Sequence, residues 1–361
     1  MARKMLRKKP ETTIQKKEQT DHYQENHRVQ PNAYDQEGGY KLYGYKDVQI
    51  PRLMRVPFVE TKYRFPGLTA DQCVWSLFEP HNEAVNIWTH LIGLVFFLVY
   101  VSRSIKTISF FDEPLTHPLL GMIVGSTAML VTSVCAHLFN AMSPYAYHIC
   151  YFFDYAGISF ATFTFSQALF FYSRPLGTSW TLFNSPETYL SLSLLNSLVC
   201  TFTCCTVLIK RPWFHIFVRS SAYLSLATFT VLPCLGRLAL CALHPSSDCV
   251  MDSAPHFKLV AIFFISAGII YVFRIPECLI PKIFDFLGHS HNIFHALSAF
   301  GTVQFFIAIY DEMSQRRGEL LSRPLAWTEL SVLFCVLAGV LNFGLVLWFS
   351  QKLYSRQSKR H

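Results

Sequence analysis

Eight long apolar runs constrain the fold of this chain more than any other feature of its sequence. Each holds about 20 residues, the length that an α-helix needs to cross the hydrocarbon core of a bilayer. Because a bilayer offers no water to unpaired backbone groups, runs that span it are helical. We therefore expect an all-α, polytopic membrane protein. The runs cover roughly residues 84–103, 118–139, 150–172, 188–209, 220–243, 257–275, 291–311 and 327–350.

The charged residues support this class and argue against another. Only 15% of the residues are Asp, Glu, Lys or Arg, against roughly 25% in soluble domains. Of the 31 Lys and Arg residues, 14 lie in residues 1–64. No basic groove interleaved with aromatic residues follows them, so we expect no nucleic-acid partner. Basic residues gathered before the first run are instead typical of a cytoplasmic tail near anionic lipid.

The apolar runs also divide the chain into five segments. Polar residues with few aliphatics fill the beginning, which predicts disorder. The segment that follows mixes aromatic, proline and charged residues. We expect a disordered cytoplasmic tail over 1–40, a juxtamembrane lead-in over 41–83, a seven-helix core over 84–311, an outer loop with the eighth transmembrane helix over 312–350, and a basic C-terminal tail over 351–361.

The positions of Lys and Arg also predict the orientation, because segments rich in them lie on the cytoplasmic side. With the tails left out, the loops hold 5 such residues inside and 7 outside for a cytoplasmic N-terminus, so the loops alone do not decide. The two tails favour a cytoplasmic N-terminus. An even number of spans places both tails on one side. In this topology Cys241 and Cys249 could form an extracytoplasmic disulfide.

Polar side chains at the same end of four runs are the second feature of this sequence. Successive spans run in opposite directions, so the end of one span lies level with the start of the next, whichever way the protein is oriented. Ionisable groups at membrane depth usually face a cavity and mark function. The groups that share this depth are Glu83, Asn86 and His90 in the first run, Ser133 and His137 in the second, Asp154 in the third, and His291 and His295 in the seventh.

Of the four imidazoles in this group, three could share one metal ion. His291 and His295 are four residues apart, so a helix places both on one face. Together with His137 they supply three nitrogen ligands and leave one position open, which is the arrangement of catalytic zinc sites. A water bound there has its pKa lowered to about 7. We therefore predict a Zn²⁺ site. The alternative is a buried hydrogen-bond network that ties helix ends together.

Asp154 and Ser133 are the candidate catalytic residues beside this predicted zinc. Asp154 could accept a hydrogen bond from the water or from an imidazole and serve as a general base. Ser133 lies one turn before His137 and could hold the water or a substrate carbonyl oxygen. His289 cannot share the helix face of the histidine pair, so we expect it in a loop or behind the ligands. His90 is expected to be structural, bonded to a neighbouring span.

At these positions the sequence resembles the progestin and adipoQ receptor family, which also takes in the haemolysin III-like proteins. Together the matching stretches cover the first seven spans. Within the family the chain looks most like the membrane progestin receptor branch, because of residues Cys73–Phe78, residues His148–Asp154 and an eighth span after Asp311–Arg317. The stretches that carry the family resemblance are Asn82–His90, Ser133–His137, Phe153–Gly157, Pro276–Glu277 and His289–His295.

The resemblance implies a seven-helix core in which His137, His291 and His295 hold zinc, with Asp154 and Ser133 near the zinc-bound water. It implies a receptor in the plasma membrane that senses a progestin-like steroid or another lipid and acts on a cytoplasmic signalling partner. The adiponectin-receptor branch implies a different activity, hydrolysis of ceramide-like amides.

Two functions of different class therefore stay open. In the first, a lipid-soluble ligand enters the helical bundle from the membrane and biases a conformation that a cytoplasmic partner reads. The large apolar and aromatic interior, with 33 Phe and 17 Tyr residues, suits such a ligand. In the second, the protein is a zinc-dependent intramembrane amide hydrolase. A third, weaker hypothesis is a protein that governs membrane lipid composition without a dedicated ligand.

Overall fold

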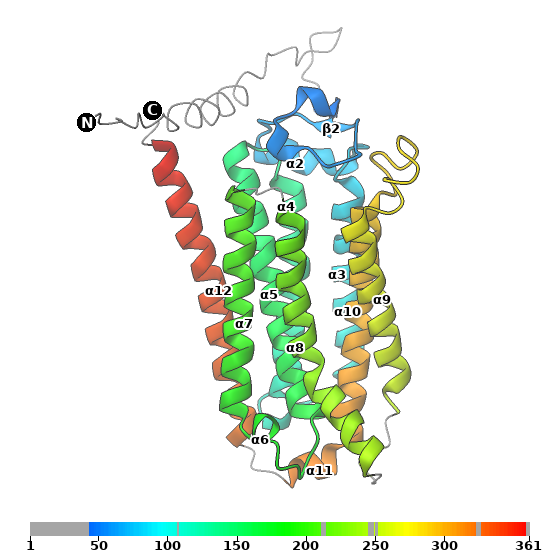
Figure 1. Ribbon diagram of the computed structural model, residues 1–361, viewed down its shortest axis with the longest axis vertical. Helices are drawn as coiled ribbons and strands as arrows, with labels where there is room; N and C mark the ends of the chain where they lie inside the picture. The colour runs from blue at the N-terminus through cyan, green and yellow to red at the C-terminus, as the bar shows by residue number, and fades with distance from the viewer. Residues whose placement is uncertain are drawn as a thin grey trace, which may run out of the picture.

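The computed structural model describes residues 43–106, 108–210, 214–244, 249, 252–322 and 326–358. Eight long helices form a bundle in this part of the chain, with their axes roughly aligned (Figure 1). They confirm the all-α fold, and one of them lies at each of the eight predicted apolar runs. Their bounds are α3 (Ala84–Ser104), α4 (His117–Phe139), α5 (Pro144–Ser173), α7 (Pro186–Lys210), α8 (His215–Leu243), α9 (Ala254–Phe273), α10 (Ser290–Gln315) and α12 (Ala326–Ser358).

Most of these helices are longer than the apolar runs that predicted them. α12 continues to Ser358, so most of the segment expected as a basic tail is helical. The tail expected over 1–40 lies outside the described residues. Two short helices, α6 (Thr181–Asn184) and α11 (Arg317–Leu321), lie at one end of the bundle (Figure 1).

α5 is the central helix of the bundle, and its composition reflects that position. Of the described helices, seven are long and apolar enough to cross a membrane, and α5 is not among them. It packs against α4, α7, α8, α10 and α12. Polar side chains such as Thr164, Ser166 and Gln167 are fully or almost fully buried along it. A helix surrounded by protein need not present an apolar face to lipid, so α5 can be less apolar than its neighbours.

The lead-in expected over 41–83 folds over one end of the bundle (Figure 1). Its antiparallel strands pair Tyr43 with Arg64, and its own small core is formed around Tyr63. Thr69 caps the helix that follows by accepting from the N–H of Gln72. The elements of this cap are β1 (Tyr43–Tyr45), η1 (Asp47–Gln49), η2 (Arg52–Met54), β2 (Tyr63–Arg64), α2 (Ala70–Trp75) and η3 (Ser76–Phe78).

The opposite end of the bundle holds a buried ion pair. Arg237 of α8 donates to a carboxylate oxygen of Glu312 on α10 at 2.5 Å, and the hydroxyl of Ser253 donates to the other carboxylate oxygen. Arg237 lies within the fifth predicted apolar run, 220–243, and its carboxylate partner explains how that helix tolerates a buried cation. Near this end, Cys241 and Cys249 form the disulfide that the sequence suggested.

Candidate metal centre

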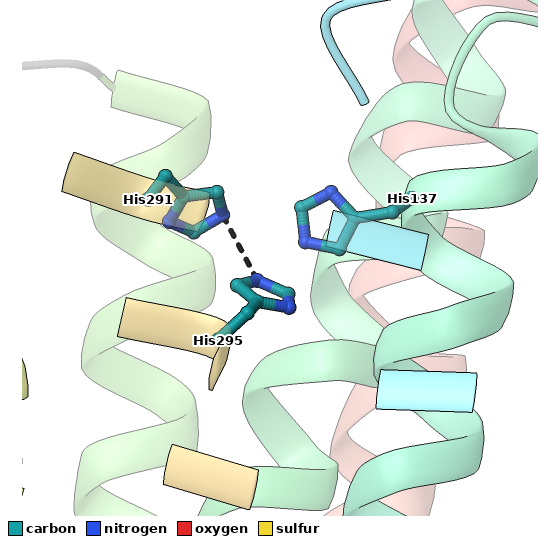
Figure 2. A group of neighbouring side chains, drawn as sticks. All are labelled: His137, His291 and His295. Carbon is teal, nitrogen blue, oxygen red and sulfur yellow. Dashed lines mark hydrogen bonds between the residues drawn. The ribbon is translucent and has the colours of Figure 1, made fainter. Parts of the chain in front are cut away.

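Three imidazoles meet at the end of the bundle that the cap covers. His137 lies in the last turn of α4, and His291 and His295 lie in the first turns of α10. Figure 2 shows the three rings turned toward one another. The Nε2 atoms of His291 and His295 are 3.2 Å apart, and one nitrogen of each of the three rings lies within 4.8 Å of the others. The structure thus brings together the three residues that the sequence singled out.

Glu83 determines which nitrogen of His137 faces the other two rings. Its carboxylate lies 2.7 Å from Nδ1 of His137 and is buried with it. Asn86 and Asn140 donate to the same carboxylate, at 2.7 and 3.3 Å. A carboxylate that accepts from one ring nitrogen fixes the orientation and tautomer of the imidazole. Nε2 of His137 is therefore left to point into the site.

Arg64 of the cap secures the end of α4 on which His137 lies. Its buried guanidinium donates to the backbone carbonyls of His137 and Leu138 at 2.6 and 2.7 Å, and to the side chain of Asn140 at 2.7 Å. The last carbonyls of a helix have no partner within it and carry partial negative charge, so a cation is favoured there. The cap is thereby joined to the backbone of a candidate ligand.

The first turn of α10 is held just as firmly. The Glu277 carboxylate accepts from the backbone N–H of Ser290 at 2.7 Å and from its hydroxyl. Two residues on, Asn292 donates to Asn86 of α3 at 2.7 Å. These bonds satisfy donors that a helix start leaves open, and they set the position of the turn that carries His291.

The surrounding histidines occupy supporting positions, as expected. The ring of His90 on α3 contacts that of His295 at a tilt, with centroids 4.0 Å apart, and its Nε2 lies 3.2 Å from the hydroxyl of Ser298. His289 precedes α10, is buried, and lies 3.5 Å from the carbonyl of Asn82. In the cap, burial and the nearby Arg64 charge lower the pKa of His81 to about 3.

The chemistry of the three rings fits a metal ion. Nε2 of His137, the nitrogen that faces the other two rings, is buried without a hydrogen-bond partner among the described residues. Two nitrogens at 2.0–2.1 Å from a tetrahedral metal are about 3.3 Å apart, close to the 3.2 Å between the Nε2 atoms of His291 and His295. The triad could therefore hold a metal. The same short distance would also suit a hydrogen bond between the two rings.

Asp154 and Ser133 lie beside the triad, as their positions in the sequence suggested. Both are buried, Ser133 on α4 one turn before His137 and Asp154 in the first half of α5. The Ser133 hydroxyl is a hydrogen-bond partner of the Asp154 carboxylate, and the cation of Arg219 on α8 lies near it. Oδ1 of Asp154 has no partner among the described residues. One carboxylate oxygen is thus available for a bound molecule.

Sequence reasoning missed the roles of Arg64, Glu277 and Arg219. Arg219 of α8 donates to Tyr155 of α5 at 2.8 Å and to Tyr271 of α9, so it links three helices. Each of the three lies far along the sequence from its partner, so no local pattern indicates the contact. Glu83 had one signal, its place at the start of the first span at the depth of the histidines.

Comparison with known proteins covers this whole region. The model of the haemolysin-III related family matches residues 78–306. The chain is 31% identical to membrane progestin receptor delta of Mus musculus, over 84% of this chain and 89% of the relative. It is 29% identical to membrane progestin receptor gamma of Homo sapiens, over 85% and 92%, and 28% identical to membrane progestin receptor gamma-B of Danio rerio, over 86% and 94%.

Proposed function

The chain belongs to the haemolysin-III related family, and from this premise we propose that it is an integral membrane receptor for a progestin-type steroid or a related lipid. The observation that carries the proposal is the extent of the similarity to proteins named membrane progestin receptors, which covers 84–86% of this chain rather than one motif. The many lipid-facing helices supply a route by which a lipid-soluble ligand arrives.

We propose further that the histidine triad holds Zn²⁺. Zinc binds imidazole nitrogen at about 2.0–2.1 Å in tetrahedral sites, and three protein ligands leave a fourth position for another molecule. The carboxylate of Glu83 behind His137 is the usual partner of a zinc-binding imidazole. When bound, the metal would polarise an oxygen atom in the fourth position.

On the open side of the site, this chain supplies Asp154 and Ser133. The unpartnered Oδ1 of Asp154 can accept a proton or a hydrogen bond from a hydroxyl or a water, and the Ser133 hydroxyl keeps the carboxylate in place. The same observation favours the second candidate function, hydrolysis of a ceramide-like amide, because a general base must lie within hydrogen-bonding reach of the proton that it removes.

The metal proposal is tested by metal analysis of the purified protein. We expect about one zinc per wild-type chain and loss of that zinc in His291→Ala, because two nitrogen ligands hold zinc much more weakly than three. His256→Ala is the matched control, since that imidazole lies on α9 and contacts Gln304 and Asp311 instead. Wild-type protein that is folded, free of metal and active would refute the proposal.

Two assays separate the two functions. Saturable binding of a radiolabelled progestin to membranes that contain the protein is expected for the receptor, and its absence would remove the steroid. Release of fatty acid from a ceramide is expected only of the hydrolase. If Asp154→Asn keeps zinc and steroid binding and wild type releases no fatty acid, the hydrolase is excluded.

The place of the protein in the cell follows from the same proposal. We propose that it lies in the plasma membrane with the N-terminus and the cap in the cytoplasm, where a signalling partner can reach the surface above the metal site. A protease-protection experiment on sealed vesicles tests the orientation. An epitope at the N-terminus that stays accessible only from the extracellular side would contradict it.

A further inference from the structure

The loop that joins α9 to α10, residues 274–289, exposes a contiguous apolar surface. Connections between packed helices usually take about 2–8 residues, so this loop is long, and Figure 1 shows it in yellow projecting sideways at the capped end of the bundle. Residues Leu279–Ile283 are exposed one after another, and Leu287 is exposed as well. We call these six residues the loop patch. Leu279 and Ile283 are exposed by 70% and 71%. Exposed apolar patches of this kind mark contacts with protein or membrane.

The loop patch continues a surface that faces lipid. α9 is long and apolar enough to cross a membrane, and little of it is buried. Its exposed side chains Ile262, Ile265, Ile269 and Phe273 recur at spacings of three and four residues, so they lie on one face of the helix. Phe273 is the last residue of α9. The lipid-facing stripe of the helix therefore leads directly into the loop.

Contacts between α3 and α10 place the loop at the membrane border. Asn292, in the first turn of α10, donates to Asn86 of α3 at 2.7 Å, so the end of the loop lies level with the start of α3. Two residues later on α3, the Trp88 ring contacts that of Phe78 in the cap, with centroids 6.2 Å apart. Phe78 and Trp75 are both exposed. Tryptophan gathers at the level of lipid headgroups, which is therefore the level of the loop.

The backbone of the loop also suits this environment. Groups that lie against lipid must find their hydrogen-bond partners within the protein. Three successive N–H groups of the loop do so, since Cys278 donates to the carbonyl of Arg274 at 2.9 Å, and Leu279 and Ile280 donate to that of Pro276 at 2.9 and 3.1 Å. The first part of the loop patch can thus meet hydrocarbon without leaving these donors unpaired.

The composition of the loop patch favours lipid over a protein partner. The energetic centres of protein interfaces are enriched in Trp, Tyr and Arg, and Leu is under-represented there. The loop patch holds Leu, Ile and Pro, with Lys282 as its single charged residue. A lysine can lay its methylene groups along hydrocarbon and keep its ammonium group in the polar layer above. The phosphates of phospholipids supply the complementary charge in that layer.

We propose that the loop patch inserts into the boundary between the headgroups and the acyl chains of the leaflet on the side of the cap, with the ammonium group of Lys282 bound to a lipid phosphate. This inference goes beyond the proposed receptor function. It rests on the membrane-spanning bundle, so it depends neither on the ligand nor on the metal.

The inserted loop holds two parts of the candidate metal site. Before the loop patch, Glu277 accepts from the backbone N–H of Ser290, which lies next to His291 at the start of α10. Within the stretch that the patch covers, Asp285 accepts from the backbone N–H of Thr61 in the cap. Lipid that holds the loop patch in place therefore also restrains the first turn of α10 and the cap.

The first test locates the loop patch relative to the membrane. p-Trifluoromethyl-phenylalanine is placed at position 283 of the full chain in phospholipid nanodiscs, and the relaxation of its fluorine NMR signal is measured with a nitroxide attached to the lipid below the headgroup and with a water-soluble gadolinium chelate. Position 48 is the matched control, because Val48 is exposed by 69% in the cap, flanked by Asp47 and Gln49. Position 265, on the exposed face of α9, marks the hydrocarbon.

We expect the lipid nitroxide to relax the signal from position 283 severalfold faster than that from position 48, and the gadolinium chelate to do the reverse. If the chelate relaxes position 283 as fast as position 48, the loop patch lies in water and the proposal is refuted. If neither reagent relaxes position 283, the patch packs against protein, such as a second copy of the chain, and the proposal is refuted as well.

The second test measures what the lipid contact does for the loop. In the double variant Ile280→Glu, Ile283→Glu, two carboxylates cannot enter the hydrocarbon, so we expect hydrogen exchange over residues 274–289 in nanodiscs to rise about tenfold or more. Lys282→Gln should raise it by about fivefold in nanodiscs of anionic lipid. Val48→Glu is the control and should leave it unchanged.

The unfolding temperature of each variant in detergent shows whether it is folded. Exchange over the loop that is equal in wild type and in a folded double variant would show that lipid does not hold the loop, and the proposal would fail. Steroid binding and zinc content are measured separately on the wild-type protein, so the receptor and metal proposals can stand or fall independently of this one.

Discussion

At the scale of single residues, Glu83 determines which nitrogen of His137 faces the candidate metal site. An imidazole can offer either nitrogen, and the carboxylate on Nδ1 of His137 leaves Nε2 for the centre. The pairing joins positions far apart in the chain, so no local spacing predicts it. The pair His291 and His295, by contrast, was predictable, because four residues make one helical turn.

Removing the charge of Glu83 should lower the affinity of the site for zinc. In Glu83→Gln the side chain keeps its shape but loses the charge that holds the His137 ring, so we expect zinc affinity to fall by about 10–100-fold. The measurement is competition with a chelator, and Glu60→Gln, at an exposed position of the cap, is the control. Equal affinity in both variants would mean that Glu83 does not orient a ligand.

His81 predicts a dependence of stability on pH. Its pKa is about 3 in the folded protein, because it is buried and lies near Arg64, and about 6.5 in an unfolded chain. Above pH 6.5 both states are neutral and stability is highest. As the pH falls from 6.5 to 4.5, the unfolded chain takes up the proton and the folded one does not. The free energy of unfolding therefore falls by about 2–3 kcal/mol.

The variant His81→Gln should lose this part of the acid sensitivity, while keeping an acceptor for the Glu83 N–H that His81 Nδ1 now binds. Unfolding by denaturant at several pH values between 7.5 and 4.5 measures the difference between the two proteins. Since both keep the zinc ligands, their loss of metal in acid cancels in the comparison. Parallel pH profiles would show that the folded His81 titrates normally.

At the scale of whole elements, the close packing of α4 against α5 depends on two glycines. A Cβ added at Gly157 would lie 2.1 Å from Oγ1 of Thr132, and one at Gly125 would lie 2.1 Å from Oγ1 of Thr164. Each helix therefore offers a glycine to a threonine of the other. This contact sets the distance between the helix with His137 and the helix with Asp154.

Replacing one of these glycines should separate the two helices. We expect Gly157→Ala to destabilise the protein by about 1–3 kcal/mol, the usual cost of overfilling a well-packed contact. Gly268→Ala on α9 is the control, because nothing lies within 4 Å of its added Cβ. There the better helix propensity should leave stability unchanged or raise it by up to about 1 kcal/mol. Thermal unfolding in detergent compares the two variants.

The elements differed in how far the sequence predicted them. The length of the apolar runs identified all eight long helices, because a helix that crosses a bilayer needs about 20 apolar residues. Their ends were less predictable: α5 begins at Pro144 behind the N-cap Ser143, whose hydroxyl accepts from the N–H of Ala146, and this polar turn precedes the apolar run. The strands and short helices of the cap were not foreseen, because aromatic residues and prolines without a period do not specify one structure.

On the scale of the whole molecule, the cap closes the end of the bundle above the candidate metal site. Arg64 joins it to the end of α4. Asp285, in the segment between α9 and α10, joins it to the other side by accepting from the N–H groups of Glu60 and Thr61 at 2.5 and 3.2 Å and from the Thr61 hydroxyl. The cap is thus bonded to the end of α4, which carries His137, and to the segment that leads into α10, which carries His291 and His295.

Removing the hydrogen bonds between Asp285 and the cap should let the cap open more often. In Asp285→Asn the charged acceptor of three donors is lost, so we expect faster hydrogen exchange over residues 43–64 and faster release of zinc to a chelator. Asp112→Asn is the control, because that carboxylate accepts from Ser109 in the segment between α3 and α4. Unchanged exchange over the cap in Asp285→Asn would show that the bonds to Asp285 do not limit its opening.

The separation of the three imidazoles along the chain has a consequence for biogenesis. A ribosome that has released α4 has delivered only His137, and the other two follow when most of the bundle is already synthesised. If the triad holds zinc as proposed, a nascent chain that ends before α10 has only one of the three ligands, and metal loading comes late in synthesis.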